Sequence, residues 1–413
     1  MTTTPENHAP ENQALPPDIL ANFYSPDFIR DPYETLEKLR ERTSAFYEPV
    51  MGRTVLLGWD DIETALRDRT YSRDPRNAAE DTLMARLRGQ DERPGTSILF
   101  LDPPDHTRLR GLVNKAFTPR AVEAMRPRIE AIAEDLLDKV EGKPTWDLIE
   151  AFAAPLPTIV IAEMLGVDPK DQPQFKAWSD NLVKGLDPFI SPEDQQRLDE
   201  SRAALDAYLR AQIAGRRAQP RDDLLSALIV AEDEGHKLTE DELLGTVSLL
   251  LVAGNVTTTD LIGNGVHALL RHPDQKDLLR DDPSLIVNAV EEMLRYDSPV
   301  VLTGRIVMDD EVVTGCPVKK GHSLTPLLAA ANHDPAVHAD PHRFDIARED
   351  PKHQSFGGGA HYCLGAPLAR AEAQVAVTTL LRRFPNLHLA GPEPERRLLI
   401  GFRGFLSLPV AVD

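Results

Sequence analysis

The sequence predicts one large, mainly α-helical domain with small β-sheets. Long segments carry apolar residues at three- and four-residue spacing, which is typical of amphipathic helices. Segments rich in β-forming residues are short and lie near 45–57, 300–327 and 396–411. The chain has 413 residues, more than an average domain, but no repeat or linker divides it. We expect a disordered tail at 1–17, rich in Pro, Asn and Glu, and a single domain at 18–413.

Proline positions help to locate helix starts in the first half of the chain. Pro32 fits the first turn of a helix predicted from Asp31 to Thr43. A strand pair is expected at 45–57, where Val and Thr occur in an alternating pattern. Apolar periodicity predicts four longer helices, at Arg120–Glu141, Trp146–Leu165, Asp194–Arg217 and Asp222–Glu234.

The longest predicted helix runs from Thr239 to about His272. Thr239 and Glu242 form the pattern of a capping box, which marks a helix start. The remaining predicted elements are a helix at Leu285–Tyr296, β-strands within 300–327 with turns near Gly315 and at 319–321, a loop-rich stretch at 332–359, a last helix at 364–384 and a terminal hairpin at 396–411.

Composition excludes several classes of function. The formal net charge of -20 disfavours binding to nucleic acid. With only Cys316 and Cys363, no disulfide framework is possible, which favours a reducing compartment. The N-terminus has neither the basic start nor the apolar centre of a secretion signal, and we identify no membrane-spanning segment. We expect a soluble, cytoplasmic monomer.

The most informative segment is Phe356–Gly365. Three glycines, at 357–359, precede Cys363, and a helix is predicted to begin just after it. A helix N-terminus favours a thiolate. A thiolate without partner ligands at metal-finger spacing fits a single axial bond to a haem iron. The alternative from these residues alone is a buried free cysteine behind a flexible glycine loop.

This segment resembles the haem-ligand signature of the cytochromes P-450, whose fixed positions are filled by Phe356, Gly359, His361, Cys363 and Gly365. The resemblance implies the P-450 fold, haem b as cofactor and Cys363 as the iron ligand. It further implies that His361 binds a haem propionate, that Phe356 shields the sulfur, and that Gly357 belongs to the haem-binding loop. Cys316 lacks such a context and is interpreted as structural.

Two further segments are candidates for binding the haem propionates. His106 and Arg110 are four residues apart, so they share one helical face and are suited to clamp a carboxylate. The alternative is an exposed basic face. The family uses a similar His and Arg for the propionates, and Gly304-Arg305 resembles its propionate-binding arginine on a strand.

Glu292 and Arg295 face the same side of a predicted helix. Alone, this is the pattern of a surface salt bridge. The family has a Glu-x-x-Arg pair here, completed by an arginine in a segment similar to 341–344. The resemblance implies a buried structural network of Glu292, Arg295 and Arg343.

The middle of the longest helix resembles the dioxygen-activating pattern of the family. Ala253 and Gly254 are small enough for a flat ring to approach, and the Thr257 hydroxyl is expected to bond the carbonyl of Ala253. The alternative is a helix merely weakened by β-branched residues. Thr257 matches the catalytic alcohol, but Val256 replaces the usual acid. Proton delivery is therefore expected to use water, oriented by Asn255 or supplied by Asp260, which lies three residues past Thr257 on the same side.

The resemblance implies a bacterial, soluble monooxygenase that oxidises a small apolar substrate. No flavin, nucleotide or iron-sulfur motif is present, so electrons are expected from a ferredoxin and its reductase. They are expected to dock on the cysteine side, near Arg108, Lys115 and Lys352. The substrate pocket is expected to include segments 82–100 and 176–192 and the residues Leu250, Ala253, Val300, Val301, Leu302, Ile400 and Phe402.

Two alternatives remain open. Val256 also suits a peroxide-driven or oxygen-independent haem-thiolate enzyme, because neither needs the usual acid. A non-catalytic haem sensor or carrier is the alternative from another class. Thr257 argues against it, because a carrier needs no alcohol beside the iron.

Overall fold

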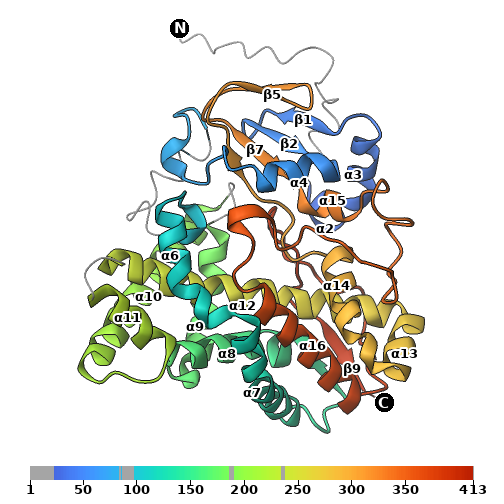
Figure 1. Cartoon of the computed structure of the whole chain (residues 1–413). Helices are drawn as coiled ribbons and strands as arrows, with labels where there is room; N and C mark the ends of the chain where they lie inside the picture. The colour runs from blue at the N-terminus through green and yellow to red at the C-terminus, as the bar shows by residue number, and fades with distance from the viewer. Residues whose placement is uncertain (1–22, 83–84, 86–96, 186–189, 234–237, 413) are drawn as a thin grey trace.

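The computed structural model describes residues 23–82, 85, 97–185, 190–233 and 238–412. A β-rich part, with β1, β2, β7 and the short helices around them, lies at one end of the molecule, and longer helices form the rest (Figure 1). The mainly α fold with small sheets is therefore confirmed. The tail predicted at 1–17 lies outside the described residues.

The helices account for most of the described chain. They are α2 (Pro26–Arg30), α3 (Tyr33–Arg40), α4 (Trp59–Arg67), α6 (Asp105–Val113), α7 (Pro119–Asp138), α8 (Pro155–Leu165), α9 (Gln172–Lys184), α10 (Pro192–Ala218), α11 (Leu224–Asp233), α12 (Glu240–Arg271), α13 (Pro273–Asp281), α14 (Ile286–Tyr296), α15 (Leu328–Asn332) and α16 (Ala366–Arg383). Several begin with a side-chain cap: Thr118, Ser191 and Thr239 each accept a backbone N–H three residues on. The capping box of Thr239 and Glu242 is confirmed.

The strands form small sheets at the rim of the helical part. The first sheet has the order β1-β2-β7-β4, in which β2 and β7 are parallel; the second has the order β3-β9-β8, and β5 pairs with β6. Their bounds are β1 (Ala45–Glu48), β2 (Arg53–Leu56), β3 (Thr145–Asp147), β4 (Arg305–Ile306), β5 (Glu311–Val313), β6 (Cys316–Val318), β7 (Ser323–Pro326), β8 (His388–Leu389) and β9 (Pro409–Ala411). Thr314 and Gly315 have positive φ, so the expected turn lies between β5 and β6.

The long helix α12 crosses the interior and packs against α8, α9 and α16 (Figure 1). These helices share the largest buried apolar cluster of the described residues. By length and composition α12 is apolar enough to span a membrane, but 61% of its most apolar window is buried inside the protein. This is the pattern of a central core helix. The middle of α12 carries the candidate residues Ala253, Gly254 and Thr257.

Two predicted elements differ in the structure. The helix expected at Trp146–Leu165 is β3, a π-helical turn at Ile149–Ala153 and then α8, because Pro155 and Pro157 fit only a first helical turn. The terminal hairpin at 396–411 is divided: bridges join Arg396 to Phe405 and Leu399 to Phe402, whereas β9 pairs with β3 and β8.

Candidate active site

The cysteine loop turns sharply between α15 and α16. Gly357 and Gly359 have φ of 66° and 65°, which favour glycine. A Cβ at Gly359 would lie 2.4 Å from the carbonyl oxygen of Leu66 in α4, so the loop is seated directly on that helix. The backbone N–H of Cys363 donates to the carbonyl of Phe356 at 2.9 Å, which closes the loop. These contacts explain why the glycines stand before the cysteine.

Cys363 is partly exposed, unlike the buried Cys316. Burial of its sulfur raises the pKa of the Cys363 thiol, although the backbone N–H groups of Gly365 and Ala366 and the charge of Arg110 oppose this. The amides at the start of α16 therefore favour the thiolate, as the sequence predicts, but burial of the sulfur outweighs them. A cation bonded to the sulfur would reverse the balance.

The side chains of Phe356 and Arg370 pack together at the cysteine loop. The guanidinium of Arg370 lies 4.5 Å from the centre of the Phe356 ring, and its Nε is 2.7 Å from Glu291 of α14. Arg370 therefore ties α16 and α14 together across Phe356. The sequence analysis did not single out Arg370, whose signal was its position on α16, seven residues after Cys363.

The four predicted propionate groups come together on one side of the loop. The rings of His106 and His361 are 4.2 Å apart between centres. Arg110 donates to the carbonyls of Ala360 and Tyr362 at 3.1 and 2.5 Å. Arg305 is buried in β4 and donates to the carbonyl of Leu66 at 3.1 Å. The alternative of an exposed basic face for His106 is excluded, since that side chain is 3% exposed.

Arg73 also belongs to this group, although no motif of the sequence indicates it. Its guanidinium donates to the Thr303 hydroxyl at 2.5 Å and to the carbonyl of Gly304 at 2.8 Å, beside Arg305. Burial and the neighbouring charge of Arg305 lower the pKa of Arg73 to about 9. Burial likewise lowers the pKa of Arg305 to about 10.

The cluster of Arg73, Arg110, Arg305, His106 and His361 carries an excess of positive charge. Burial and the three arginines, with His106, lower the pKa of His361 to about 2. The carboxylate that acts on Arg73 and Arg305 is Asp102. Three guanidinium groups facing one carboxylate leave two positive charges in excess. The two propionates of one haem would neutralise that excess, so the residues present fit this cofactor.

The middle of α12 offers a flat, open surface. Ala253 and Gly254 are exposed, although neighbouring turns are buried, and a Cβ added at Gly254 meets nothing within 4 Å. The Thr257 hydroxyl donates to the carbonyl of Ala253 at 2.8 Å, as the sequence predicted. Small residues and a hydroxyl turned back on the helix leave room for a planar group.

Two residues expected beside Thr257 face elsewhere. Asn255 is 2% exposed and accepts a hydrogen bond from Thr158 of α8 at 2.7 Å, so its amide is engaged in helix packing. Asp260 is 1% exposed and accepts from Arg397 at 2.6 Å, on the side of the 396–405 hairpin. The expectation that Asp260 opens toward the same space as Thr257 is wrong, because Arg397 draws its carboxylate away.

The expected substrate residues divide between pocket and core. Phe402 packs with Val183, Val256 and Leu399 against α12. Val301 is 5% exposed and packs with Phe46 and Leu327, so it belongs to the core under the first sheet and not to a pocket. Leu302 packs against that same cluster, and Leu250 lies in the main core. Val300 and Ile400 are half-buried, and the backbone of Val300 forms a β-bridge with Phe402. Segments 82–100 and 176–192 lie partly outside the described residues.

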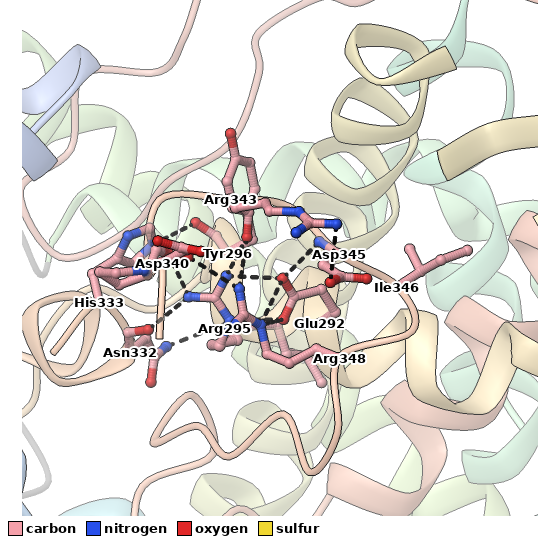
Figure 2. Close-up of polar contacts among 12 residues, drawn as sticks. Glu292, Arg295, Tyr296, Asn332, His333, Asp340, Arg343, Asp345, Ile346 and Arg348 are labelled. Carbon is pink, nitrogen blue, oxygen red and sulfur yellow. Dashed lines mark hydrogen bonds and ion pairs between the residues drawn. The ribbon is translucent and has the colours of Figure 1, made fainter. Parts of the chain in front are cut away.

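A buried ion pair stands behind the cysteine loop. Arg295 donates to Glu292 at 2.7 and 2.8 Å, and both side chains are 0% exposed (Figure 2). Arg295 also donates to the carbonyl of Asn332 at 2.9 Å. The Asn332 side chain accepts from the N–H of Gln354 at 2.7 Å and donates to Ser355. The pair therefore positions Gln354 and Ser355, which lead into the loop. The sequence predicts the Glu292–Arg295 pair but not the part that Asn332 plays in it.

The third arginine of this network is Arg348 and not Arg343. The Arg343 side chain is 63% exposed and lies 3.5 Å from Asp345; only its carbonyl accepts from Arg295 (Figure 2). Arg348 is 11% exposed and lies 3.3 Å from Glu292. The chain turns between the two residues, with Asp345 N–H donating to Glu292, and this turn brings Arg348 inward.

Comparison with known proteins identifies the family. A family model described as Cytochrome P450 matches residues 15–406. The chain belongs to the cytochrome P450 family. A cytochrome P450 of Priestia megaterium is 42% identical over 405 residues, which cover 94% of this chain and 98% of that protein. The 6-deoxyerythronolide B hydroxylase of Saccharopolyspora erythraea is 39% identical and covers 96% and 99%. A myxobacterial cytochrome P450 in complex with myristic acid has a TM-score of 0.89 at 39% identity, covering 95% of this chain and 99% of that structure.

As a cytochrome P450, the protein is a haem-thiolate monooxygenase whose cofactor is haem b. The solved structures also establish the P450 fold for this chain.

Proposed function

We propose that this cytochrome P450 inserts one oxygen atom from dioxygen into a small, mostly apolar organic molecule, using two electrons from a ferredoxin and its reductase. The observation that carries this proposal is the Thr257 hydroxyl bonded to Ala253, where α12 exposes only small side chains. The other oxygen atom leaves as water with two protons. A cytoplasmic, monomeric enzyme is consistent with the composition.

In this proposal each group of the chain has one task. Cys363 would bind the iron, and Arg73, Arg110, Arg305, His106 and His361 would hold the propionates. The bound haem supplies iron for dioxygen activation, with electron density from the thiolate. Phe356 covers the loop against water beneath Arg370. Thr257, whose hydroxyl proton is donated to the carbonyl of Ala253, would accept a hydrogen bond from water and so orient it on the open side of α12.

The apolar character of the substrate rests on the residues beside α12. Val183, Val256, Leu399 and Phe402 form one apolar cluster at the level of Thr257. Such a lining favours molecules with exposed C–H bonds over charged ones. The similar myxobacterial structure holds myristic acid, which supports a mainly apolar ligand.

The proposed docking surface for ferredoxin is the concave face over the cysteine loop. A depression of about 640 Å³ is lined by Trp59 and Arg67 of α4, by Lys352 and by the loop glycines. Lys115 is exposed and suits an acidic partner, whereas the exposed Lys352 shares its charge with Asp350, 3.4 Å away. Arg108 was expected here, but its guanidinium pairs with Glu242 at 2.5 Å and with Asp105, so its charge is balanced within the protein.

The experiment starts with the purified haem protein. The reduced carbon-monoxide adduct should show the red-shifted Soret band of thiolate ligation, and replacing Cys363 by Ser should abolish it. Ligands are then screened by the spin-state shift of the resting enzyme. With a ligand, ferredoxin, its reductase and labelled dioxygen, one labelled atom should enter the product. Product without label would overturn the proposal.

Val256 favours a second candidate, a peroxide-driven or oxygen-independent enzyme. This side chain is 4% exposed and packed in the apolar cluster, so it carries no proton where the family has an acid. Turnover with hydrogen peroxide that exceeds turnover with ferredoxin, or turnover with neither oxidant, would favour this candidate.

A further inference from the structure

The inference concerns how the 396–405 hairpin is held beside the middle of α12. Its tip carries Leu399 and Phe402, which pack with Val183 and Val256 in the apolar cluster assigned above to the substrate. The other members of this cluster lie on helices, whereas the tip is a turn of the chain. The position of the tip therefore determines the shape of the substrate lining on this side.

Asp297, which follows α14, binds one arginine from each arm of the hairpin. Its Oδ2 accepts from Arg396 at 2.7 Å, and its Oδ1 accepts from the Nε of Arg403 at 2.8 Å. All three side chains are 14% exposed or less. Burial alone would raise the pKa of Asp297, but the charges of Arg396 and Arg403 outweigh it and lower that pKa well below its ordinary value. One buried, charged carboxylate therefore joins the two arms.

Asn264 of α12 adds a neutral link to this arrangement. Its side-chain N–H groups donate to the carbonyl of Asp297 at 3.1 Å and to the carbonyl of Arg403 at 3.0 Å. Its side-chain oxygen accepts from Arg396 at 3.4 Å, and the whole side chain is 0% exposed. The base of the hairpin is thus fixed to the helix that also carries Val256.

Arg403 extends the connection to α2. Its Nη1 donates to the carbonyls of Ile29 and Arg30 at 3.0 and 2.8 Å. These carbonyls belong to the last turn of α2, where backbone oxygens lack helical partners. The guanidinium also lies over the ring of Tyr33, 5.2 Å from its centre. Arg403 therefore uses several donors of its planar fork at once, which a lysine cannot do.

A second ion pair holds the same arm. Arg397 pairs with Asp260 of α12 at 2.6 Å, and Asp260 is 1% exposed. Three arginines of one short hairpin are thus bound to two buried carboxylates of the helical part. A loop held by backbone bridges alone would adopt several positions, whereas buried ion pairs with further hydrogen bonds favour one geometry.

We propose that Asp297, Arg396 and Arg403 form a clamp that determines substrate specificity, because it fixes the hairpin tip relative to α12. The three are positioning residues, which act through Leu399 and Phe402. The inference rests on the proposed function, since it concerns the lining against which the apolar substrate would lie. A fixed tip selects molecules whose apolar body fills the space beside it, and a released tip would bind them less tightly.

The test compares Arg403→Lys with Arg216→Lys in the haem protein. Lysine keeps a positive charge beside Asp297, but it cannot bind Asp297 and the α2 carbonyls together. Arg216 is the matched control, because its side chain is also 5% exposed, pairs with Asp223 at 2.7 Å and donates to the carbonyl of Gly166. It lies near the end of α10, outside the substrate lining assigned above.

Two azole ligands measure the hold of the tip without turnover. Imidazole and 1-dodecylimidazole bind a haem iron through the same nitrogen and shift the Soret band, but only the second has an apolar chain that reaches the lining. The unchanged protein should bind the dodecyl compound at least about tenfold more tightly. This preference should fall about tenfold in Arg403→Lys and stay within about twofold in Arg216→Lys.

Three results would overturn the inference: an unchanged preference in Arg403→Lys, an equal loss of preference in both variants, or equal binding of the two azoles by the unchanged protein. Arg396→Lys provides a second variant on the other arm and should lower the preference in the same way. Because both arginines act through Asp297, the double variant should lose less than the product of the two single effects. Independent effects would contradict a common clamp.

Failure of the proposed function gives a different result. Binding of azoles needs neither dioxygen nor ferredoxin, so an enzyme that makes no labelled product would overturn the monooxygenase proposal and leave the azole preference as it is. With an oxidised ligand, Arg403→Lys should raise KM more than it lowers kcat and should spread oxidation over more carbon positions. An unchanged KM and product pattern would contradict the role of the clamp.

Discussion

Arg348 lies 3.3 Å from Glu292, so one buried carboxylate holds both this arginine and Arg295. Arg348 also donates to the carbonyls of Ala339, Asp340 and Arg343. It therefore fixes the turn that follows α15 as well as the ion pair. Removing Arg348 leaves Glu292 paired with Arg295, so the loss is that of the 3.3 Å contact and of the three hydrogen bonds that hold the turn.

We predict that Arg348→Gln destabilises the protein by about 1.5–3 kcal/mol, because hydrogen bonds from a charged group to Glu292 and to the turn are lost. Arg343→Gln should cost less than about 1 kcal/mol, since that side chain is exposed. Denaturant unfolding of the haem protein, followed by the Soret band, measures both. Similar losses in the two variants would show that Arg343, as the sequence suggested, belongs to the network.

Arg73 provides a second prediction. Arg73→Met should speed haem loss about tenfold or more, because charge-assisted hydrogen bonds to a propionate would be removed. The haem-free protein should lose little stability, since repulsion between Arg73 and Arg305 disappears together with the bonds to Thr303 and Gly304.

Arg76→Met is the matched control, because Arg76 is 53% exposed and pairs with Asp74. Haem transfer to an excess of apomyoglobin gives the rate of loss, and thermal unfolding of the haem-free chain gives its stability. If Arg73→Met weakens only the haem-free chain, its role is structural.

Local motifs made much of this site predictable. The cysteine loop, the Glu292–Arg295 pair and Thr257 each depend on short spacing within one loop or helix, which the sequence displays directly. Apolar periodicity is equally local, and it predicts the bounds of most long helices to within a few residues. α8 differs because adjacent β3 and the π-turn share its apolar character, and apolar periodicity does not separate them.

Residues set by distant chain crossings were not predictable. Arg73 meets Thr303 across 230 positions, and Asp260 meets Arg397 across 137. Nothing in the spacing around either residue indicates its partner. For Asp260, helical geometry gave the correct proximity to Thr257, but a tertiary ion pair determined where the carboxylate points.

A third prediction concerns Thr257. Thr257→Ala should lower the amount of product formed per pair of electrons by about tenfold, because the hydroxyl that orients water is removed. Thr257→Ser keeps a hydroxyl and should retain most of the coupling. Thr258→Val, at a buried neighbour, serves as control and should leave coupling unchanged. Product and consumed electrons are measured in the same reaction. Unchanged coupling in Thr257→Ala would exclude the proposed role.

Glu372 gives a prediction about pH. This α16 residue is 2% exposed, and its Oε1 has no partner in the described part of the chain. Burial raises the pKa of Glu372 to about 8 from an ordinary value of 4.5. Below pH 4.5 the folded and unfolded chains both hold this proton. Between pH 4.5 and about 8 the unfolded chain loses it and the folded chain keeps it, so stability falls as pH rises.

In that window Glu372 should cost about 1.4 kcal/mol of stability per pH unit, and the cost should level off above the folded pKa. Glu372→Gln cannot ionise, so its free energy of unfolding should lack this contribution and should exceed that of the unchanged protein increasingly toward pH 8. Denaturant unfolding of the two haem-free proteins at several pH values measures the difference. Curves that stay parallel from pH 5 to 8 would mean that water or a neighbour compensates the buried carboxylate, because only an uncompensated carboxyl holds its proton at neutral pH.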